Sequence, residues 1–466
     1  QGVDWLCFLD GLQFGALLAD DMGLGKTVEL LAMLSIRTAA QSRQGPKTSL
    51  LVLPASLIGN WTGEIERFLP SLRCFVAHPS GGADKDMLRR GPALDDVDLV
   101  ITTYGLCQKY AWLQNVQWDL VVLDEAQAIK NPGTQQTRAV KKLRARNRIV
   151  MTGTPIENRL SDLWSLFDFL NPGLLGTVEE FGGFSRKLNR DSSGYARLKK
   201  VVGPYILRRL KTDKTVISDL PDKIEMKTYA ELSRKQVVLY QDLVKQLRQV
   251  LEEQPDGIRR KGLILASLMK FKQLCNHPDQ YLGQGGYAEL DSGKFQRLRP
   301  ICETIFEKRE KMLVFTQFKE MTGPLKEFLD AIFGHEGLVL HGGTPVGKRR
   351  QMIERFQSDE YTPFMVLSLK AGGVGLNLTA ANHVVHFDRW WNPAVEDQAT
   401  DRAFRIGQQR NVVVHKFVTK GTVEEKIDQM LTEKAELSRQ IIPDSGEAWI
   451  TEMDDKELIR LFTLSL

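Results

Sequence analysis

Short, mainly apolar runs recur through the first 155 residues. They cover residues 15–19, 49–54, 98–104, 119–125 and 148–155. The runs are rich in Val, Ile and Leu, and most end in Gly, Pro, Ser, Thr or Asp, which is typical of strands buried on both faces of a parallel sheet. The segments between them show helical periodicity, which indicates βαβ units.

The pattern is mainly helical from about residue 159 to about residue 280. Residues 232–253 are its clearest part, because apolar side chains recur there at spacings of three and four. Strand-like runs then return at residues 311–318, 337–343, 364–369, 383–388 and 412–418. Residues 283–294 are rich in Gly and polar side chains, which favours a linker.

This alternation predicts an α/β fold with two lobes built on parallel sheets, with helical insertions between and around them. We assign residues 1–160 to the first lobe, 161–282 to the helical insertions and inter-lobe region, 283–440 to the second lobe, and 441–466 to a C-terminal helical tail. A chain of 466 residues is long enough for such a two-lobed core without a disulfide scaffold.

Composition narrows the class of protein only slightly. The five cysteines form no Cys-x-x-Cys pair, so we expect them to be reduced and mostly packed. No run of apolar residues is long enough to predict a membrane span, and no signal peptide is predicted. The first residue is Gln1, so we expect the chain to be part of a longer protein. The formal net charge of +5 permits a polyanionic partner without requiring one.

A glycine-containing turn lies between the first apolar run and a helix-like segment. It spans the candidate nucleotide-binding residues Asp20, Asp21, Met22, Gly23, Leu24, Gly25, Lys26 and Thr27. Small residues let backbone N–H groups close around phosphate oxygens, while the lysine would reach the β and γ phosphates and the threonine would hold Mg²⁺. The strict phosphate-loop pattern has Gly where this chain has Asp20. The alternative is a strand-to-helix turn that binds nothing.

A second element strengthens the case for nucleotide hydrolysis. Asp124 and Glu125 follow an apolar run in the same predicted lobe. A carboxylate there is able to hold Mg²⁺, and its neighbour is able to take a proton from an attacking water. The alternative is a solvated strand end. Together with the glycine turn, the pair predicts phosphoryl transfer to water, with Thr27 and Asp124 as metal ligands.

A pair of arginines in the second predicted lobe suits the same chemistry. Arg402 and Arg405 are three residues apart, so we expect them on one face of a helix. Cationic groups from another domain stabilise the charge that develops on a transferring phosphoryl group. The alternative is an ordinary solvated basic helix face.

Motifs that follow one another along nearly the whole chain carry a family resemblance. They include LADDMGLGKT, LPASLIGNW, LDEAQAIKN, MTGTPIENRLSDLW, YILRRLKTD, QLCNHP, LVFTQF and GGVGLNLTAANHVVHFDRWWNPAVEDQATDRAFRIGQ. In this order they resemble the ATPase core of the Swi/Snf-type family within helicase superfamily two, over roughly residues 1–440. The compact chain with short insertions resembles prokaryotic members.

The resemblance implies two RecA-like lobes with ATP between them, DNA-stimulated ATP hydrolysis, and movement along duplex DNA without full strand separation. It implies that Lys26 contacts phosphate, Asp124 holds Mg²⁺ and Glu125 activates water. Gln398, Arg402 and Arg405 match the last helicase motif, with the arginines as fingers, and residues 151–155 match the segment that couples the lobes.

The chain departs from the family pattern at several positions. Asp21 stands where Glu is common, Gln127 where His is frequent, and Phe404 where His is usual. These differences bear on how the site responds to DNA. The adenine-contacting Gln of the family would lie before Gln1.

The same resemblance implies sequence-independent contacts to the backbone of double-stranded DNA. The candidates are short hydroxyl, amide, glycine and basic residues: Ser56, Thr102, Thr103, Tyr104, Arg159, Thr316, Gln317, Gly342, Ser368, Lys370 and Gly372. The alternative is ordinary capping and turn chemistry, which these residue types supply widely.

Several other segments favour structural interpretations. Residues 141–148 are expected to be the exposed face and end of a crossover helix, and residues 259–274 a packed helix whose Lys270 and Lys272 are candidates to flank a duplex. Trp390 and Trp391 favour packing or lobe closure over base stacking, since a duplex keeps its bases paired. One Cys and one His, Cys275 and His277, do not make a zinc site.

Two rival functions remain at this point. A strand-separating helicase would need a wedge element, and none is evident in the helical insertions. A DNA-binding scaffold switched by ATP would not need the water-activating Glu125. The sequence does not specify which cargo is moved; a protein bound to DNA is one candidate. We expect a cytoplasmic, nucleoid-associated protein if the source is prokaryotic and a nuclear one if it is eukaryotic.

Overall fold

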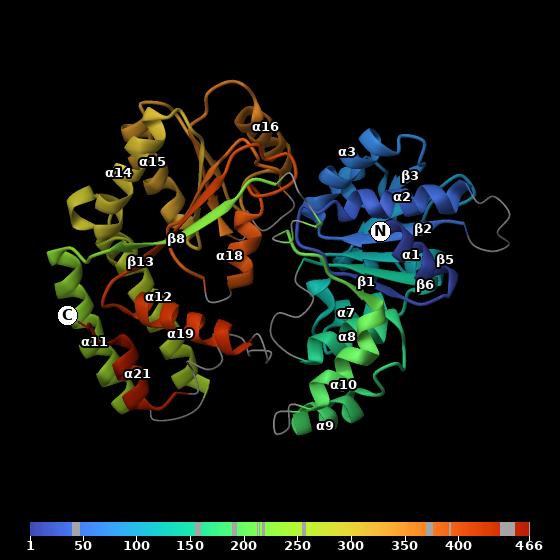
Figure 1. The fold of residues 1–466 in the computed structure, drawn as a ribbon, viewed down its shortest axis with the longest axis horizontal. Coiled ribbons are helices and arrows are strands. Elements are labelled where there is room, and N and C mark those ends of the chain that lie inside the picture. The colour runs from blue at the N-terminus through green and yellow to red at the C-terminus, as the bar shows by residue number, and fades with distance from the viewer. Residues whose placement is uncertain are drawn as a thin grey trace. The chain divides into compact units, whose positions relative to one another are not determined.

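The computed structural model divides the chain into two compact units, Gln1–Ser218 (unit 1) and Asp219–Leu466 (unit 2). Each unit contains one sheet covered by helices (Figure 1). The structure describes residues 1–39, 47–153, 160–188, 193–211, 213, 215–216, 220–253, 258–369, 376–390, 393–438 and 453–465.

Unit 1 is built on a parallel sheet with the strand order β3-β4-β2-β5-β6-β1-β7. The strands are β1 Ala16–Leu18, β2 Ser49–Leu53, β3 Cys74–Val76, β4 Leu99–Thr103, β5 Gln117–Asp124, β6 Arg144–Met151 and β7 Ile206–Leu207. Strands β2 and β4 are buried at every position, as expected for central strands covered on both faces.

The helices of unit 1 lie on both faces of this sheet. In Figure 1, α2 (Lys26–Ala39) and α3 (Ile58–Phe68) lie on one side, and α7 (Gln135–Lys141) and α8 (Leu160–Leu170) on the other. The remaining helices are α1 Gly2–Gly11, α4 Lys85–Arg90, α5 Tyr104–Lys109, α6 Trp112–Asn115, α9 Val178–Leu188 and α10 Ser193–Val202.

A buried ion-pair cluster fixes α2 against the sheet. Arg37 of α2 pairs with Asp10 of α1, and its Nη2 lies 2.6 Å from a carboxylate oxygen of Asp119 in β5. Asn147 of β6 donates to the same Asp10 at 2.8 Å. Because these groups are all buried, the loss of one partner would leave an uncompensated charge. The cluster therefore holds the helix that begins at Lys26 in a fixed position.

Unit 2 also has a parallel sheet, with the order β10-β11-β9-β12-β13-β8. The strands are β8 Lys223–Ala230, β9 Met312–Thr316, β10 Leu338–Leu340, β11 Phe364–Ser368, β12 His383–His386 and β13 Val412–Thr419. The helices are α11 Arg234–Glu253, α12 Ile258–Asn276, α13 Pro278–Leu282, α14 Gly293–Glu307, α15 Thr322–Phe333, α16 Val346–Gln357, α18 Pro393–Thr400, α19 Val423–Ser438 and α21 Asp455–Phe462.

Alternating side chains of the strands feed two cores in unit 2. Leu313 and Phe315 of β9 pack into a cluster with Phe356 of α16, whereas Met312 and Val314 pack into a cluster with residues of α14 and α15. A third cluster joins α11, α12, α19 and α21 into a helical bundle attached to the sheet. Unit 2 is thus a three-layer α/β unit with a helical subregion.

The predicted fold class is confirmed: both units are α/β with parallel sheets, and each predicted strand run contains a strand. Strands β3, β7 and β8 were not predicted. Residues 161–282 were expected to be a helical region, but they contain β7, which pairs with β1, and β8, which pairs with β13. They contribute to both units rather than standing apart from them.

Two local expectations need correction. Residues 141–148 were expected to be the exposed face and end of a helix, but only Lys141 belongs to a helix, α7. Most of the segment lies in β6, which begins at Arg144. The proposed linker 283–294 includes a short 3₁₀ turn and the start of α14 at Gly293. Within the described part of the chain, no helix is long and apolar enough to cross a membrane.

Candidate functional site

The glycine turn lies at the carboxyl end of β1 and leads directly into α2. Gly23 and Gly25 have φ angles of 82° and 86°, a region that favours glycine. Lys26 and Thr27 open the helix, whose free N–H groups and dipole favour an anion. The backbone therefore has the form of a phosphate-binding loop.

Lys26 folds back over this loop. Its Nζ donates to the carbonyl oxygens of Asp20 and Asp21 at 2.6 and 3.2 Å. A lysine held by carbonyl oxygens in this way is poised to exchange them for phosphate oxygens, which carry full charge and form stronger hydrogen bonds.

The acidic residues of the loop are anchored by the segment that follows β7. Asp20 is fully buried, and its carboxylate accepts from the Arg209 backbone N–H at 2.7 Å and from Arg209 Nε at 3.0 Å. The same guanidinium bonds both oxygens of Glu29 at 2.8 and 2.7 Å. Asp21 exchanges hydrogen bonds with the backbone of Arg209 and Lys211. The carboxylates of Asp20 and Asp21 thus tie the loop to the segment that follows β7.

Asp124 ends β5 and is held by three neighbours. Trp61 Nε1 donates to Oδ2 at 2.8 Å, the Glu125 N–H donates to Oδ1 at 3.0 Å, and the Tyr104 hydroxyl donates to the Asp124 carbonyl at 2.7 Å. Removal from water, followed by the charge of Glu125, raises the pKa of the Asp124 carboxyl to about 7. The charge of Lys26 opposes this rise, so the lysine and the carboxylate share one electrostatic environment.

These residues fit the magnesium ion that ATP hydrolysis requires. Carboxylate and hydroxyl oxygens, as on Asp124 and Thr27, are the ligands that Mg²⁺ prefers, and a cation relieves a carboxylate whose pKa is raised by burial. The described part of the chain has no group of three or more His, Cys, Asp or Glu side chains able to hold a metal alone.

Glu125 occupies an unusual backbone position. Its φ and ψ are 50° and 56°, the left-handed region that side chains other than glycine rarely adopt. Gln127 Nε2 donates to the Glu125 carboxylate at 3.0 Å, and the Thr152 hydroxyl lies 3.5 Å from Gln127 Oε1. The candidate base is therefore linked through Gln127 to the predicted coupling segment.

The coupling segment also touches the phosphate loop. Thr152 N–H donates to the Leu18 carbonyl at 3.1 Å, and a Cβ on Gly153 would lie 2.8 Å from the Met22 side chain. Residues 154 and 155 lie outside the described residues. Unit 1 therefore brings together the phosphate loop, the Asp-Glu pair and the start of the coupling segment.

The arginines predicted in unit 2 do not share a helix face. Helix α18 carries Gln398 and ends at Thr400, so Arg402 and Arg405 lie in the turns that follow. Arg402 is 3% exposed, while Arg405 is half-buried and its Nη1 donates to the Leu376 carbonyl at 3.3 Å. The three-residue spacing was misread as helical because α18 stops two residues before the first arginine.

The candidate DNA contacts of unit 1 differ in access. Ser56 is exposed just beyond β2. Thr102, Thr103 and Tyr104 are buried at the end of β4, and the Thr102 hydroxyl donates to the Ala77 carbonyl at 3.1 Å. The hydroxyls of Thr102 and Tyr104 thus have acceptors within unit 1, and contact of these residues with DNA stays a prediction. Arg159 lies outside the described residues.

In unit 2 the candidates gather at the carboxyl ends of three neighbouring strands. Thr316 ends β9 and Gln317 follows it, Gly342 lies beyond β10, and Ser368 ends β11. Gly342 is exposed and Gln317 is half-buried, but Thr316 and Ser368 are buried. The Thr316 hydroxyl donates to Asp388, and contact of Thr316 with DNA stays a prediction. Lys370 and Gly372 lie outside the described residues.

Comparison with known proteins gives the family. The model of the SNF2-related domain matches residues 1–280, and that of the helicase conserved C-terminal domain matches residues 293–407. The chain belongs to the SNF2-related family. The predicted Swi/Snf resemblance is thereby confirmed.

Relatives of this SNF2-related chain include a bacterial and a yeast protein. It is 43% identical over 476 residues to a candidate ATP-dependent helicase/translocase of Bacillus subtilis, covering 100% of this chain and 50% of the relative. It is 32% identical over 532 residues to the TATA-binding protein-associated factor MOT1 of Saccharomyces cerevisiae, covering 99% and 28%. A Sulfolobus solfataricus SWI2/SNF2 ATPase core, solved in complex with dsDNA, is 42% identical, with a TM-score of 0.48 and coverage of 100% and 96%. The chain thus spans about half the length of the Bacillus relative.

Two residues at the SNF2-related site were quoted within motifs but given no role. Arg209, in the YILRR motif, anchors the phosphate loop, and Trp61, in the LIGNW motif, holds Asp124. A tryptophan or arginine inside a family motif is a usable signal, but only the fold shows which carboxylate it meets.

Several other side chains of unit 2 that the sequence singled out differ in burial and contacts. Lys270 is exposed on α12, but Lys272 is 2% exposed, so it does not flank a duplex directly. Trp390 packs against the apolar clusters of unit 2, and Trp391 lies outside the described residues. His277, which was not predicted to form a zinc site with Cys275, has its Nε2 3.0 Å from the Ala288 carbonyl oxygen.

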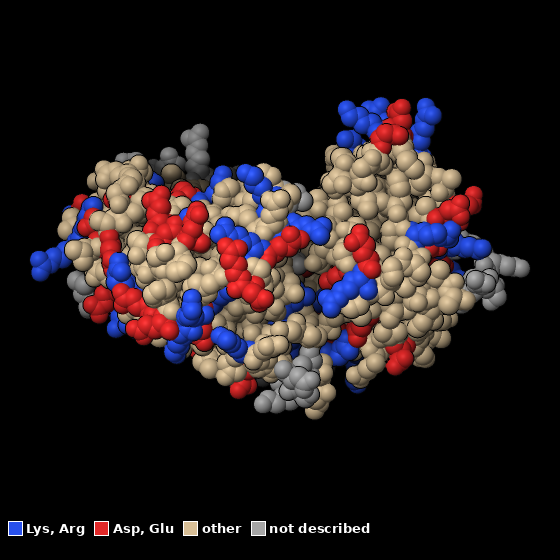
Figure 2. Space-filling view, turned by 90° about the horizontal axis from the view of Figure 1, so that it is seen from above, with Lys and Arg blue, Asp and Glu red and all other residues tan. Residues whose placement is uncertain are grey.

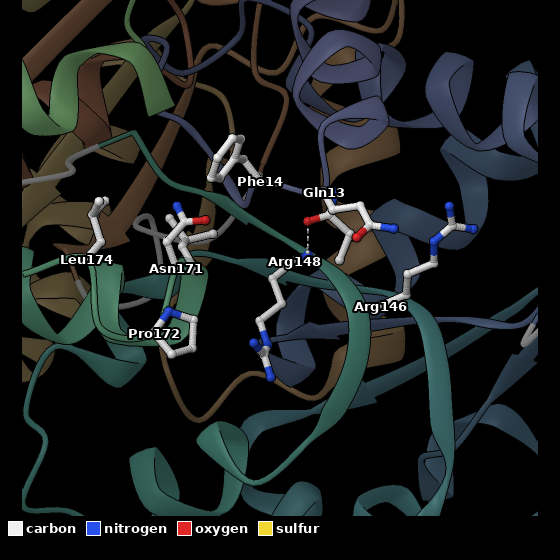
Figure 3. A pocket seen from close by; sticks show the side chains of 9 residues that line it. Gln13, Phe14, Arg146, Arg148, Asn171, Pro172 and Leu174 are labelled. Carbon is white, nitrogen blue, oxygen red and sulfur yellow. Dashed lines mark hydrogen bonds between the residues drawn. The ribbon is translucent and has the colours of Figure 1, made fainter.

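A cavity of about 340 Å³ lies in unit 1 near the amino end of β1 (Figure 3). Gln13 and Phe14, just before β1, line it together with Arg146 and Arg148 in the first part of β6. Since the phosphate loop and Asp124 lie at the carboxyl ends of the strands, this cavity is separate from the nucleotide site.

Charged side chains of both signs are mixed on the face of the molecule shown in Figure 2. In the view of Figure 2, Lys and Arg alternate with Asp and Glu, and no continuous basic face stands out. Charge on this face therefore does not single out any of the candidate DNA contacts.

Proposed function

We propose that this chain is the motor core of an ATP-dependent translocase that moves along double-stranded DNA without fully separating the strands. The observation that carries the proposal is the meeting of Lys26, Asp124 and Glu125 within unit 1, beside the start of the coupling segment. Family membership supports ATP as the nucleotide and DNA as the stimulus.

The residues of unit 1 divide the chemistry among them. Lys26 releases its two carbonyl partners to hold phosphate oxygens. Glu125, oriented by Gln127, positions a water and accepts its proton. Thr27 and Asp124 would hold Mg²⁺, which neutralises negative charge on the phosphates.

The residues of unit 2 respond to the transferring phosphoryl group and to DNA. We assign Arg402 and Arg405 the role of stabilising the negative charge that develops on the γ-phosphoryl oxygens, with Gln398 as a supporting contact. Gln317 and Gly342, together with Ser56 of unit 1, are assigned to DNA phosphates. Such contacts grip any sequence and weaken steeply with salt.

Phosphate release with and without linear duplex DNA tests the enzyme assignment. We expect duplex to stimulate release at least tenfold and higher salt to reduce this stimulation. Glu125→Gln should abolish the stimulated turnover, by roughly 10²–10⁴-fold, while nucleotide binding persists. Stimulated turnover that survives Glu125→Gln would remove the catalytic assignment.

Strand displacement separates translocation from unwinding. We expect the full chain with ATP to remove a third strand from a triplex-containing duplex while leaving a forked duplex paired. Unwinding of the fork would favour the strand-separating helicase instead. The name of the yeast relative links that protein to the TATA-binding protein, and we propose that the cargo here is likewise a protein bound to DNA.

A further inference from the structure

The turn that carries Gln317 is fixed by a buried carboxylate. Asp388, just beyond β12, is fully buried and accepts from the Gln317 N–H at 2.8 Å. It also accepts from the Thr316 hydroxyl and from Asn276 Nδ2 of α12, the latter at 3.2 Å. The backbone of this proposed DNA-contacting turn is therefore tied both to the sheet and to α12.

Lys272 joins the same turn from α12. Its Nζ donates to Gln317 Oε1 at 3.1 Å and to the Arg389 carbonyl. An ammonium group only donates, so the amide oxygen of Gln317 must face the lysine and the amide nitrogen must face away. That nitrogen is buried, and within the described part of the chain it has no hydrogen-bond partner. It is therefore an unsatisfied donor within this turn.

Arg389 continues the chain of contacts to α18. Its Nε lies 2.9 and 3.1 Å from the two carboxylate oxygens of Glu396, and its Nη1 bonds Asp428 of α19. The Trp390 N–H donates to the same Glu396 at 2.7 Å. Glu396 is fully buried and precedes Gln398 by two residues on α18.

The contacts form one continuous polar path through the core of unit 2. It runs from Gln317 through Lys272 and the Arg389 backbone to Glu396 at the start of the helix that leads to Arg402. Its charged members are buried and paired, so displacing one member leaves the charge of the next member uncompensated. These contacts give a shift at the turn a physical route to α18.

We propose that Lys272 is a positioning residue that couples the DNA-contacting turn at Gln317 to helix α18 and so to Arg402 and Arg405. The proposal rests on the proposed function. Lys272 touches neither DNA nor nucleotide; it orients the Gln317 amide and holds Arg389, and through them it makes ATP turnover respond to DNA.

The test measures basal and duplex-stimulated ATPase rates of the full chain for Lys272→Met. Met keeps the length of the side chain but removes the donor. We expect the basal rate to stay within twofold and the stimulation at saturating duplex to fall at least tenfold. Lys261→Met is the matched control, because Lys261 is exposed on the same helix and has no predicted DNA contact, and it should retain wild-type stimulation.

A double-mutant cycle with Gln317→Met separates this coupling from the DNA contact itself. The combined variant should be no worse than the more affected single variant, because both break one link. Additive losses, or wild-type stimulation in folded Lys272→Met, would overturn the proposal while leaving the motor function intact. If Lys272→Met fails to fold, Gln317→Met alone should lower stimulation, and a wild-type value there overturns the proposal. A wild-type chain that ignores duplex would instead refute the proposed function, and the coupling with it.

Discussion

The guanidinium of Arg209 holds the buried carboxylate of Asp20, a residue 189 positions earlier in the chain. The pairing goes beyond one side chain, since the Asp21 N–H also donates to the Arg209 carbonyl at 3.1 Å. The segment after β7 therefore continues the β1–β7 pairing alongside the phosphate loop. The shape of that loop depends on the last part of unit 1.

Arg209→Ala should weaken both the fold and nucleotide use. Asp20 would be left as an uncompensated buried charge, which costs about 3–5 kcal/mol in comparable pairs. We expect a lower thermal unfolding midpoint and a raised KM for ATP, measured by calorimetry and phosphate release. Arg208→Ala is the control, because Arg208 is exposed beside it. Similar effects in both variants would argue against the anchoring role.

The left-handed backbone at Glu125 predicts a trade between stability and turnover. A residue with a Cβ in this region costs about 1–2 kcal/mol, which glycine avoids. Glu125→Gly should therefore be more stable than Glu125→Ala by about 1 kcal/mol, although both lack the carboxylate and should be inactive. Thermal unfolding of the two variants checks this, and equal midpoints would show that the conformation is not strained.

Burial of Asp124 predicts a pH-dependent cost. Its pKa is raised to about 7, so between pH 5 and 7 the folded state holds a proton that the unfolded state has lost, and stability falls as pH rises. The effect should be about 1–2 kcal/mol. Asp124→Asn should flatten this dependence. Adding Mg²⁺ should raise the unfolding midpoint at pH 8 in the wild-type chain and not in Asp124→Asn; an equal rise in both would place the ion elsewhere.

The predicted strands β2 and β4 share a physical property that the missed strands β7 and β8 lack. β2 and β4 are buried at every position, so their sequences are apolar throughout. β8 is exposed over much of its length and alternates Lys and Glu with apolar residues, and β7 has only two residues. Such edge strands exist because a neighbour pairs with them, and local composition does not record that neighbour.

The site shows the same division. The phosphate loop and the Asp124–Glu125 pair were predictable because their residues are adjacent in sequence. The partner of Asp20 was not, because it comes from the far end of unit 1. The spacing of Arg402 and Arg405 suggested a helix, but the end of α18 at Thr400 is set by packing in unit 2. Lys272 was a candidate to flank a duplex for the same reason. The sequence does not show that its Nζ meets acceptors on Gln317 and Arg389, which lie beyond β9 and β12.

The finger role predicts a specific kinetic signature for Arg402. A contact that matures in the transition state lowers kcat far more than affinity when it is removed. Arg402→Ala should lower duplex-stimulated kcat by roughly 10³-fold, with the ATP dissociation constant changed by less than about threefold. Arg410→Ala, whose side chain is 66% exposed in the same region, is the control. Equal losses of kcat and affinity would point to a structural role for Arg402.

The coupling role of Lys272 predicts a pH profile with a distinctive sign. Burial lowers the pKa of Lys272 to about 8, against the opposing charges of Asp388 on the β12 side, Glu424 on α19 and Glu396 on α18, while Lys294 of α14 lowers it further. Above pH 8 the neutral amine no longer fixes the amide orientation, so duplex stimulation should fall between pH 7.5 and 9 with a midpoint near 8.

Stability should change in the opposite direction over this range. The folded chain releases the Lys272 proton near pH 8 and the unfolded chain near pH 10.5, so the unfolded state binds more protons between them and stability rises with pH. A loss of stimulation at pH 9 without a loss of stability would therefore be local to the coupling path. Lys272→Met should show low, flat stimulation across the same range. A wild-type profile that stays level to pH 9 would contradict the role of the charged lysine.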